Sequence, residues 1–237
     1  LDFIGKDLGP EGMRKSVLVV ATSDQPAMMR SKCAVVATAI AEYFQDRGRD
    51  VLLMMDSLTR FAMAQREIGL AVGEPPVSRG YPPSIYADLP KLLERSGNFA
   101  RGSITGIYTV LVEGDDTNEP ISDTVRGILD GHIILSRALA QRNHYPPIDV
   151  GMSISRLMND IVDENQLRLS QKMRELLAVY YENYDLIAIG AYKKGSNPAV
   201  DKALRYIGRV NAFLQQEIDA SFTYEETAGL MAEVLDG

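Results

Sequence analysis

An uninterrupted apolar run, "VLLMM" at residues 51–55, constrains the fold of this chain most strongly, because it stops abruptly at Asp56. The run is too short to span a membrane, and it lacks the in-out alternation of a half-exposed strand. It is typical of a strand that is covered on both faces, as in a parallel sheet. Open α/β sheets bind ligands at the carboxyl ends of their strands. We therefore predict that this strand delivers Asp56 to the metal ion of a bound nucleotide.

The segments on either side extend this pattern. "SVLVVAT" (residues 16–22) is a second candidate for a buried strand. The segment after it has an apolar face at helical spacing, formed by Cys33, Val36, Ala37, Ile40, Ala41 and Phe44. Further helices are expected at residues 58–69, 87–94 and 121–129, and further strands at residues 103–113, 131–137 and 148–156. Because strands alternate with helices, we predict a three-layer α/β domain with a largely parallel sheet.

Composition narrows the class of protein. Of the 237 residues, 46% are hydrophobic and 24% are charged, which is ordinary for a soluble globular chain. The net charge of -7 disfavours a nucleic-acid-binding face. Cys33 is the single cysteine, so no internal disulfide can form, which fits a reducing compartment. We interpret Cys33 as a small hydrophobe on a buried helix face rather than as a reactive thiol.

The character of the chain changes after about residue 160. Asn197 followed by Pro198 is a helix-start signal, with the asparagine as the N-cap. Two apolar stripes at helical spacing are formed by Leu169, Met173, Leu176, Leu177 and Tyr180, and by Ala203, Ile207, Val210 and Leu214. We therefore divide the chain into an α/β part, residues 1–160, and a helical carboxyl-terminal domain, residues 161–237.

An apolar strand that ends in an acid is the Walker-B pattern, in which the carboxylate orders Mg²⁺ opposite the phosphates of a nucleotide. The pattern alone is weak, because turns favour aspartate for their own reasons. Arg156, at the end of "SISR", has the charge and planar shape to stabilise a transferring phosphoryl group. Taken alone, however, this arginine is better explained by a surface salt bridge. Tyr145, in "HYPPID", could stack on a base, but taken alone it is better explained by packing in the core.

Longer stretches together point to one family. They are "LLMMDSLTRFAMAQREIGLAVGEPP", "GYPPSIYADLPKLLERSG", "GSITGIYTVLVEGDD", "ISDTVRGILDGHIILSR", "HYPPIDVGMSISR" and "GAYKKGSNPAVDKALRYI". The sequence resembles the catalytic subunits of rotary-type ATPases, which are similar to ATP synthase α and β. Within this family it looks most similar to the flagellar type III protein export ATPases. The resemblance extends over essentially all 237 residues.

The resemblance implies a fold and a set of site residues. It implies a RecA-like P-loop NTPase core with a mostly parallel sheet, truncated at its amino-terminal side, followed by a carboxyl-terminal all-α domain. ATP and Mg²⁺ would be the ligands. Asp56 would be the Walker-B acid that holds Mg²⁺ through water, and Arg60 would lie toward the γ-phosphate. Arg156 would be the arginine finger for a neighbouring subunit, and Tyr145 would stack on adenine.

Several other residues match the family pattern without an implied role. These are Arg95 in "LLERSG" and the loop acids Asp115 and Asp116. His132 and His144 have no metal-ligand partner at a useful spacing, and we interpret both as structural.

The departure from the family pattern is as informative as the match. The phosphate-cradling sequence G-x-x-x-x-G-K-[ST] does not occur in the 237 residues. Gly5-Lys6-Asp7 is not an equivalent, because Asp7 has no metal-binding hydroxyl. The family also uses a glutamate that polarises water, and no residue here matches it. We therefore expect these residues to be a fragment of a longer ATPase and to be inactive alone.

The resemblance also implies partners and a location. The full-length protein would be a homo-hexamer that contacts the flagellar export apparatus, a stalk and chaperone–substrate complexes, without nucleic acid. It would be cytoplasmic and peripherally associated with the inner face of the cell membrane at the export gate. Three alternatives stay open: a virulence type III secretion ATPase, a catalytic subunit of an ATP synthase or vacuolar-type ATPase, and a fragment that only docks chaperones or substrates.

Overall fold

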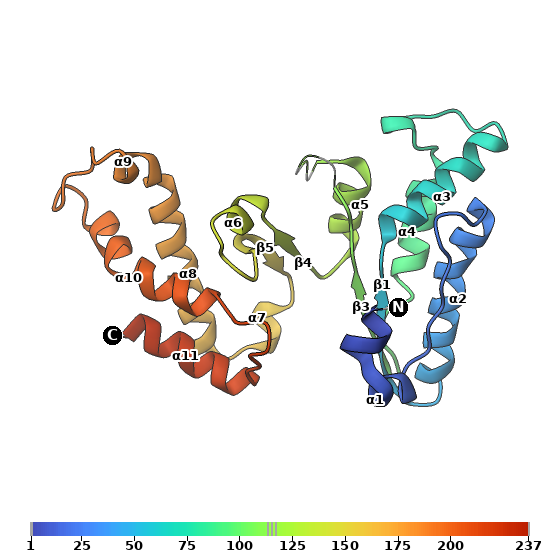
Figure 1. The fold of residues 1–237 in the computed structure, drawn as a ribbon, viewed down its shortest axis with the longest axis horizontal. Helices are drawn as coiled ribbons and strands as arrows, with labels where there is room; N and C mark the ends of the chain where they lie inside the picture. Colours follow the sequence, from blue (N-terminus) through green and yellow to red (C-terminus); the bar gives the residue numbers. More distant parts are fainter. Residues whose placement is uncertain (1, 113, 115, 117, 237) are drawn as a thin grey trace. The chain divides into compact units, whose positions relative to one another are not determined.

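The computed structural model describes residues 2–112, 114, 116 and 118–236, and the chain divides into two compact units, residues 1–129 and 130–237 (Figure 1). The first unit contains η1 (Phe3–Leu8), α1 (Gly9–Arg14), α2 (Ala27–Gln45), β1 (Asp50–Met55), α3 (Leu58–Ala71), η2 (Ser78–Gly80), α4 (Ser84–Leu93), β2 (Gly97–Asn98), β3 (Ser103–Tyr108) and α5 (Pro120–Ile128). The second contains β4 (Gly131–Leu135), α6 (Arg137–Gln141), β5 (Ile148–Ser155), α7 (Met158–Ile161), α8 (Glu164–Glu182), α9 (Tyr184–Ala188), α10 (Pro198–Leu214) and α11 (Tyr224–Asp236).

The first unit is built on a small mixed sheet with the strand order β1-β3-β2. β1 and β3 are parallel and in register from Asp50 opposite Ser103 to Met55 opposite Tyr108, so both strands end at the same edge of the sheet. β2 pairs antiparallel with β3. The parallel pairing predicted for the apolar run is confirmed, but the predicted cover on both faces is wrong, because Leu52 and Met54 are exposed and only Leu53 is buried.

Helices pack around this sheet and form the core of the first unit. Leu58, Ile85, Leu89 and Ile121 are completely buried in one hydrophobic cluster contributed by α3, α4 and α5. The hydroxyl oxygen of Ser57 accepts a hydrogen bond from the Arg60 backbone N–H and caps α3. A cap at this position begins the helix directly after the strand, and so sets where the turn at Asp56 lies.

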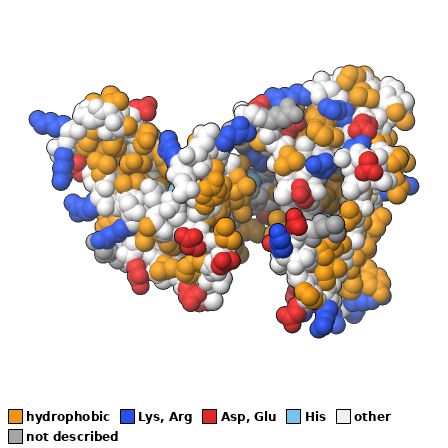
Figure 2. All heavy atoms as spheres, viewed as in Figure 1, with side chains coloured by type: hydrophobic (Ala, Val, Ile, Leu, Met, Phe, Trp, Pro, Cys, Tyr) orange, Lys and Arg blue, Asp and Glu red, His pale blue; other side chains and the backbone are white. Residues whose placement is uncertain are grey.

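Two expectations for the amino-terminal region are wrong in whole or in part. Residues 16–22 form no strand, because no strand in the described part of the chain supplies them with ladder hydrogen bonds. The expected buried face of α2 is only partly correct: Ala41 is buried as expected, but Val36 and Phe44 are exposed and Ala34, outside the expected set, is buried. Hydrophobic side chains gather over the region of α2 on the face shown in Figure 2.

The second unit combines a two-stranded sheet with a helical cluster. β4 and β5 are antiparallel, with an irregularity between His132 and Ile134, so the sheets of the described residues are mixed rather than mostly parallel. The α8 stripe is confirmed, since Leu169, Met173, Leu176 and Leu177 form the core of the cluster with residues of α10 and α11.

The predicted start of α10 is also confirmed. The Asn197 side chain accepts a hydrogen bond from the Ala199 backbone N–H, and Pro198 is the first residue of the helix. The chain thus has the predicted α/β class followed by a helical carboxyl-terminal part. None of the helices in the described part of the chain has the length and apolar composition that crossing a bilayer requires.

Candidate functional site

Asp56 lies immediately after the carboxyl end of β1, where the sequence predicts it. Its side chain is exposed, and its Oδ1 accepts a hydrogen bond of 2.9 Å from the Thr109 hydroxyl. Thr109 follows β3 as Asp56 follows β1, so the two residues continue the parallel register by one step. The turn therefore presents a carboxylate at the strand edge where α/β sheets bind ligands.

Asp56 and Arg60 line one pocket of about 130 Å³ in the first unit. Arg60 lies one turn into α3 and its side chain is exposed. Arg30 and Cys33 of α2 also line the pocket. Arg30 is held by an ion pair with Glu67, at 2.6 Å from Nη2 to Oε2, and burial raises the pKa of the Cys33 thiol. The pocket thus combines one carboxylate with two arginines, a set of charges suited to a metal-bound phosphate.

The donor groups of the pocket fit Mg²⁺ bound together with a nucleotide. Across the described residues, no group of three or more His, Cys, Asp and Glu side chains could hold a metal ion. Mg²⁺ characteristically keeps several waters and takes only one or two carboxylates, with phosphates as its other ligands. Asp56 therefore fits the single carboxylate that Mg²⁺ takes from a protein when it is bound with a nucleotide.

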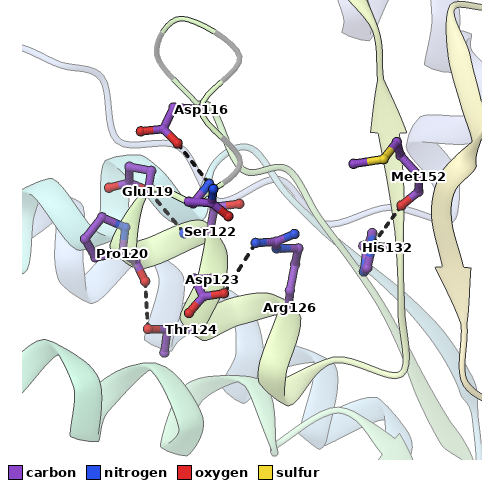
Figure 3. Close-up of polar contacts among 10 residues, drawn as sticks. Asp116, Glu119, Pro120, Ser122, Asp123, Thr124, Arg126, His132 and Met152 are labelled. Atoms are coloured by element: carbon purple, nitrogen blue, oxygen red, sulfur yellow. Dashed lines mark hydrogen bonds and ion pairs between the residues drawn. The ribbon is translucent and has the colours of Figure 1, made fainter.

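A second pocket, of about 500 Å³, is also lined in part by residues of α3. Arg60 lines this pocket too, together with Arg66, Arg79, Tyr81 and Glu119. The guanidinium of Arg66 lies 5.2 Å from the centre of the Tyr81 ring. Glu119 is buried, and its Oε2 accepts the Ser122 backbone N–H at the start of α5 (Figure 3). The glutamate therefore acts as a helix cap here.

The two remaining predicted site residues lie in the second unit, at opposite ends of β5. Arg156 follows the last residue of this strand, and its backbone N–H donates to the Asp130 carbonyl at 2.7 Å. Tyr145 precedes the strand and is 52% exposed. Its backbone carbonyl oxygen accepts a hydrogen bond of 2.9 Å from the Gln216 backbone N–H. An eight-residue strand separates them by roughly 25 Å. Arg156 and Tyr145 therefore do not meet within this unit, and their roles stay predictions.

The residues without an implied role are also placed. Arg95 forms a two-point ion pair with Glu42 of α2, at 2.6 Å. Asp116 pairs with Arg79 and accepts the Asn118 backbone N–H (Figure 3), and the hydrogen bond from Arg79 lowers the pKa of this carboxyl. Asp115 lies outside the described residues.

The two histidines make local contacts in the second unit. A ring nitrogen of His132, Nε2, lies 3.1 Å from the Met152 carbonyl oxygen (Figure 3). His144 is buried, with its Nδ1 at 3.3 Å from Gln215 Nε2. The other ring nitrogen of His144, Nε2, is buried with no hydrogen-bond partner among the described residues, so the structural role of the two histidines stays a prediction.

Sequence reasoning missed Thr109, which touches Asp56 directly. The signal that could have found it is the strand register: in two parallel strands that end together, the residues that follow the strands lie side by side. Sequence reasoning also missed the capping role of Ser57 at α3.

Comparison with known proteins agrees with this geometry. The ATP synthase alpha/beta family, nucleotide-binding domain, matches residues 1–155. The T3SS EscN ATPase C-terminal domain matches residues 162–233. A flagellum-specific ATP synthase from Bacillus subtilis is 55% identical over 98% of this chain and 53% of its own length. The chain thus spans about half the length of the curated relatives it matches.

Solved structures agree as well. The assembled ATPase EscN from the type III secretion system of enteropathogenic E. coli superposes with a TM-score of 0.92, at 50% identity, over 95% of this chain and 55% of that one. EscN in complex with its central stalk EscO gives a TM-score of 0.87 at 49% identity, over 96% of this chain and 55% of that one. With an acid at the end of β1 and a family match over residues 1–155, this chain belongs to the ATP synthase alpha/beta family.

Proposed function

We propose that the whole protein to which these residues belong hydrolyses ATP with Mg²⁺ and uses the energy to drive flagellar type III protein export. The observation that carries the proposal is the position of Asp56, at the carboxyl end of β1 and in one pocket with Arg60. The match of residues 1–155 to a nucleotide-binding domain supports a nucleotide as the ligand of this pocket.

The residues of the first unit have separate tasks in this proposal. Asp56 would accept hydrogen bonds from the waters of the metal ion and thereby orient them. Bound Mg²⁺ would neutralise charge on the β- and γ-phosphates. Arg60 places a guanidinium in the same pocket, where it stabilises negative charge on the γ-phosphate. The phosphate-cradling loop and the water-polarising glutamate are outside these 237 residues in our proposal, so the chain alone binds ATP poorly and does not hydrolyse it.

The residues of the second unit would act across a subunit boundary. We assign Arg156 as the arginine finger toward the nucleotide of the next subunit in a homo-hexamer, and Tyr145 as the ring that stacks on adenine. The exposure of both side chains supports these roles, because a buried side chain could reach neither ligand. A finger supplied in trans is a known device for stabilising charge during phosphoryl transfer.

The two parts of the chain would have different roles. We place the boundary at residue 160, so that residues 1–160 belong to the ATPase domain and residues 161–237 form the helical domain. The two family matches support this division, because one ends at residue 155 and the other begins at residue 162. The helical domain would contact a central stalk and chaperone–substrate complexes, and the protein would act in the cytoplasm, peripherally bound at the export gate of the cell membrane.

A virulence secretion ATPase is the second candidate. The similarity to EscN, at 50% identity, favours it about as much as the Bacillus relative favours flagellar export. The two candidates share one chemistry and differ in the exported cargo. Restoring motility to a Bacillus subtilis strain that lacks its flagellum-specific ATP synthase would favour the flagellar role, and failure in this strain with rescue of a virulence secretion strain would favour the second candidate.

ATP turnover tests the shared chemistry. In the whole protein, Asp56→Asn should lower Mg²⁺-dependent turnover by about 100-fold or more, because the remaining amide cannot supply the negative charge. Asp50→Asn is the matched control, since Asp50 is an exposed acid at the opposite end of β1. It should leave turnover within about twofold of the unmodified protein.

The 237-residue chain provides a second test of the proposal. It should show no turnover above background, because its phosphate-binding loop is missing. Turnover that survives Asp56→Asn in the whole protein would contradict the role of Asp56, and appreciable turnover by the purified chain would contradict the division of the machinery.

A further inference from the structure

The turn that carries Asp56 is held by a segment that follows β3. The Thr109 backbone N–H donates to the Met55 carbonyl at 3.1 Å, and the Thr109 carbonyl accepts the Leu58 N–H at 3.0 Å. Two residues later, the Thr59 hydroxyl and the Leu111 backbone exchange hydrogen bonds, with Leu111 N–H to Thr59 Oγ1 at 2.8 Å and Thr59 Oγ1 to the Leu111 carbonyl at 3.2 Å. Thr109 is thus fixed on both sides of its own Cα.

We propose that Thr109 is the positioning residue for the Asp56 carboxylate, an inference that rests on the proposed function. Its hydroxyl donates to Oδ1 and leaves the other carboxylate oxygen for the waters of the metal ion. In the described part of the chain, no other side chain or backbone group donates to Asp56.

The distances decide which partner the hydroxyl serves. Thr109 Oγ1 lies 2.9 Å from Asp56 Oδ1 and 3.5 Å from the Met55 carbonyl oxygen. Hydroxyl hydrogen bonds favour 2.5–3.0 Å, and those to an ionised acceptor are roughly twice as strong as neutral ones. The carboxylate is therefore the main acceptor.

The fixed position of Thr109 allows its hydrogen bond to restrict the orientation of the Asp56 carboxylate. Asp56 is exposed, so without a partner its carboxylate would rotate among several orientations. A β-branched side chain on a fixed backbone has few χ1 rotamers, so the Thr109 hydroxyl is held in a nearly constant direction. One rigid donor to one oxygen restricts the carboxylate before the ligand arrives, which reduces the entropy lost on binding.

The test compares three substitutions in the whole protein. Thr109→Val keeps the shape and removes the hydroxyl, and Thr109→Ser keeps the hydroxyl. Thr105→Val is the matched control, because Thr105 is an exposed threonine of β3 that pairs opposite Leu52, away from the turn. Each variant is first checked for an unchanged unfolding midpoint within about 2 °C.

Two readouts separate positioning from a general structural role. The first is the Mg²⁺ concentration at half-maximal ATP turnover. The second is the affinity for Mn²⁺ in the presence of ADP, measured by calorimetry without turnover. Thr109→Val should raise the half-activating Mg²⁺ concentration and weaken Mn²⁺ binding by about 3- to 10-fold, with the KM for ATP at saturating Mg²⁺ changed less than about twofold. Thr109→Ser should restore both metal readouts, and Thr105→Val should change neither.

The outcomes distinguish this inference from the function on which it rests. If Asp56→Asn abolishes turnover while Thr109→Val leaves both metal readouts unchanged, the positioning role is wrong and the proposed function stands. If Asp56→Asn has no effect on metal dependence, the proposed function itself fails. Equal losses in Thr109→Val and Thr109→Ser would also overturn the inference, because the serine retains the donor.

Discussion

Arg95 donates two hydrogen bonds of 2.6 Å to the Glu42 carboxylate, from Nε to Oε1 and from Nη2 to Oε2. Arg95 follows α4 and Glu42 lies in α2, so the pair joins two helices that are distant in the sequence. The hydrogen bonds from Arg95 lower the pKa of the Glu42 carboxyl, and the same contact raises the pKa of the arginine. The family pattern singled out Arg95 without a role, and this ion pair provides a structural one.

Replacing Arg95 tests whether the two-point contact matters. Arg95→Lys keeps the charge but loses the planar fork, so we expect the free energy of unfolding to fall by about 0.5–1.5 kcal/mol. Equilibrium urea unfolding of the whole protein gives the value. Lys91→Arg is a suitable control, because Lys91 is an exposed cation of α4 with a one-point contact to Asp88. A change below about 0.2 kcal/mol for Arg95→Lys would show that the fork adds nothing beyond charge.

The same pair predicts a pH dependence of stability. Because the folded-state pKa of Glu42 is below its ordinary value of 4.5, its stabilising effect is complete above that value and is lost as the pH falls through the folded-state pKa. We therefore expect Glu42→Gln to be less stable than the unmodified protein at pH 7 and to approach it in stability as the pH falls below 4.5 and through the lowered pKa of Glu42. Urea unfolding at a series of pH values measures the difference. A difference that is the same at pH 3 and pH 7 would contradict the assignment.

Gly106 makes room for the Tyr108 ring on the same face of β3. A Cβ at Gly106 would lie 2.6 Å from Tyr108 Cε2, and the ring could withdraw only by giving up its 2.7 Å hydrogen bond with Ser96. Gly106→Ala should therefore lower the free energy of unfolding by about 1–2 kcal/mol. Thermal or urea unfolding of the whole protein is the measurement.

A second-site variant and a neutral glycine control this prediction. In a Tyr108→Ala background the clash is removed, so Gly106→Ala should cost less than about 0.5 kcal/mol. Gly127→Ala, on α5, meets no atom within 4 Å and should be neutral or slightly stabilising. A full cost of Gly106→Ala in the Tyr108→Ala background would place the effect in the strand backbone instead.

Mixed assemblies test whether Arg156 acts on a neighbour. Arg156→Ala and Asp56→Asn subunits should each be inactive alone. Mixed in equal amounts, about a quarter of the interfaces would join an intact Asp56 to an intact Arg156 of the adjacent subunit, and turnover should reappear. Arg209→Ala, at an exposed position of α10, should be active throughout. If mixing restores nothing while both subunits co-assemble, Arg156 does not complete a neighbouring site.

The strand β1 and the acid that follows it could be predicted because residues adjacent in the sequence determine this part of the site. Five apolar residues followed by Asp56 indicate a strand with a polar end, and β1 is such a strand and pairs parallel with β3, although Leu52 and Met54 on one of its faces are exposed. The Asn197 cap of α10 could be predicted for the same reason, because it depends only on Asn197 and the residues that follow it. Residues 16–22 have the same apolar character, but a strand also needs a neighbour for its hydrogen bonds, and sequence composition does not report whether one is present.

Contacts between distant segments were beyond sequence reasoning for a different reason. The apolar residues of α2 could face either way. The structure packs the small Ala34 against residues of α3 and Ala41 against Leu53 of β1, while Val36 and Phe44 stay exposed. Thr109 is separated from Asp56 by 53 positions, and only the strand register brings them together.

Arg60 borders both pockets of the first unit, so a substitution there alters two cavities at once. The loss of function of an Arg60 variant could therefore not be assigned to one pocket or the other in a genetic screen. Ser23 borders the smaller pocket and Met63 the larger, and a bulky residue introduced at one or the other would assign a phenotype to a single cavity.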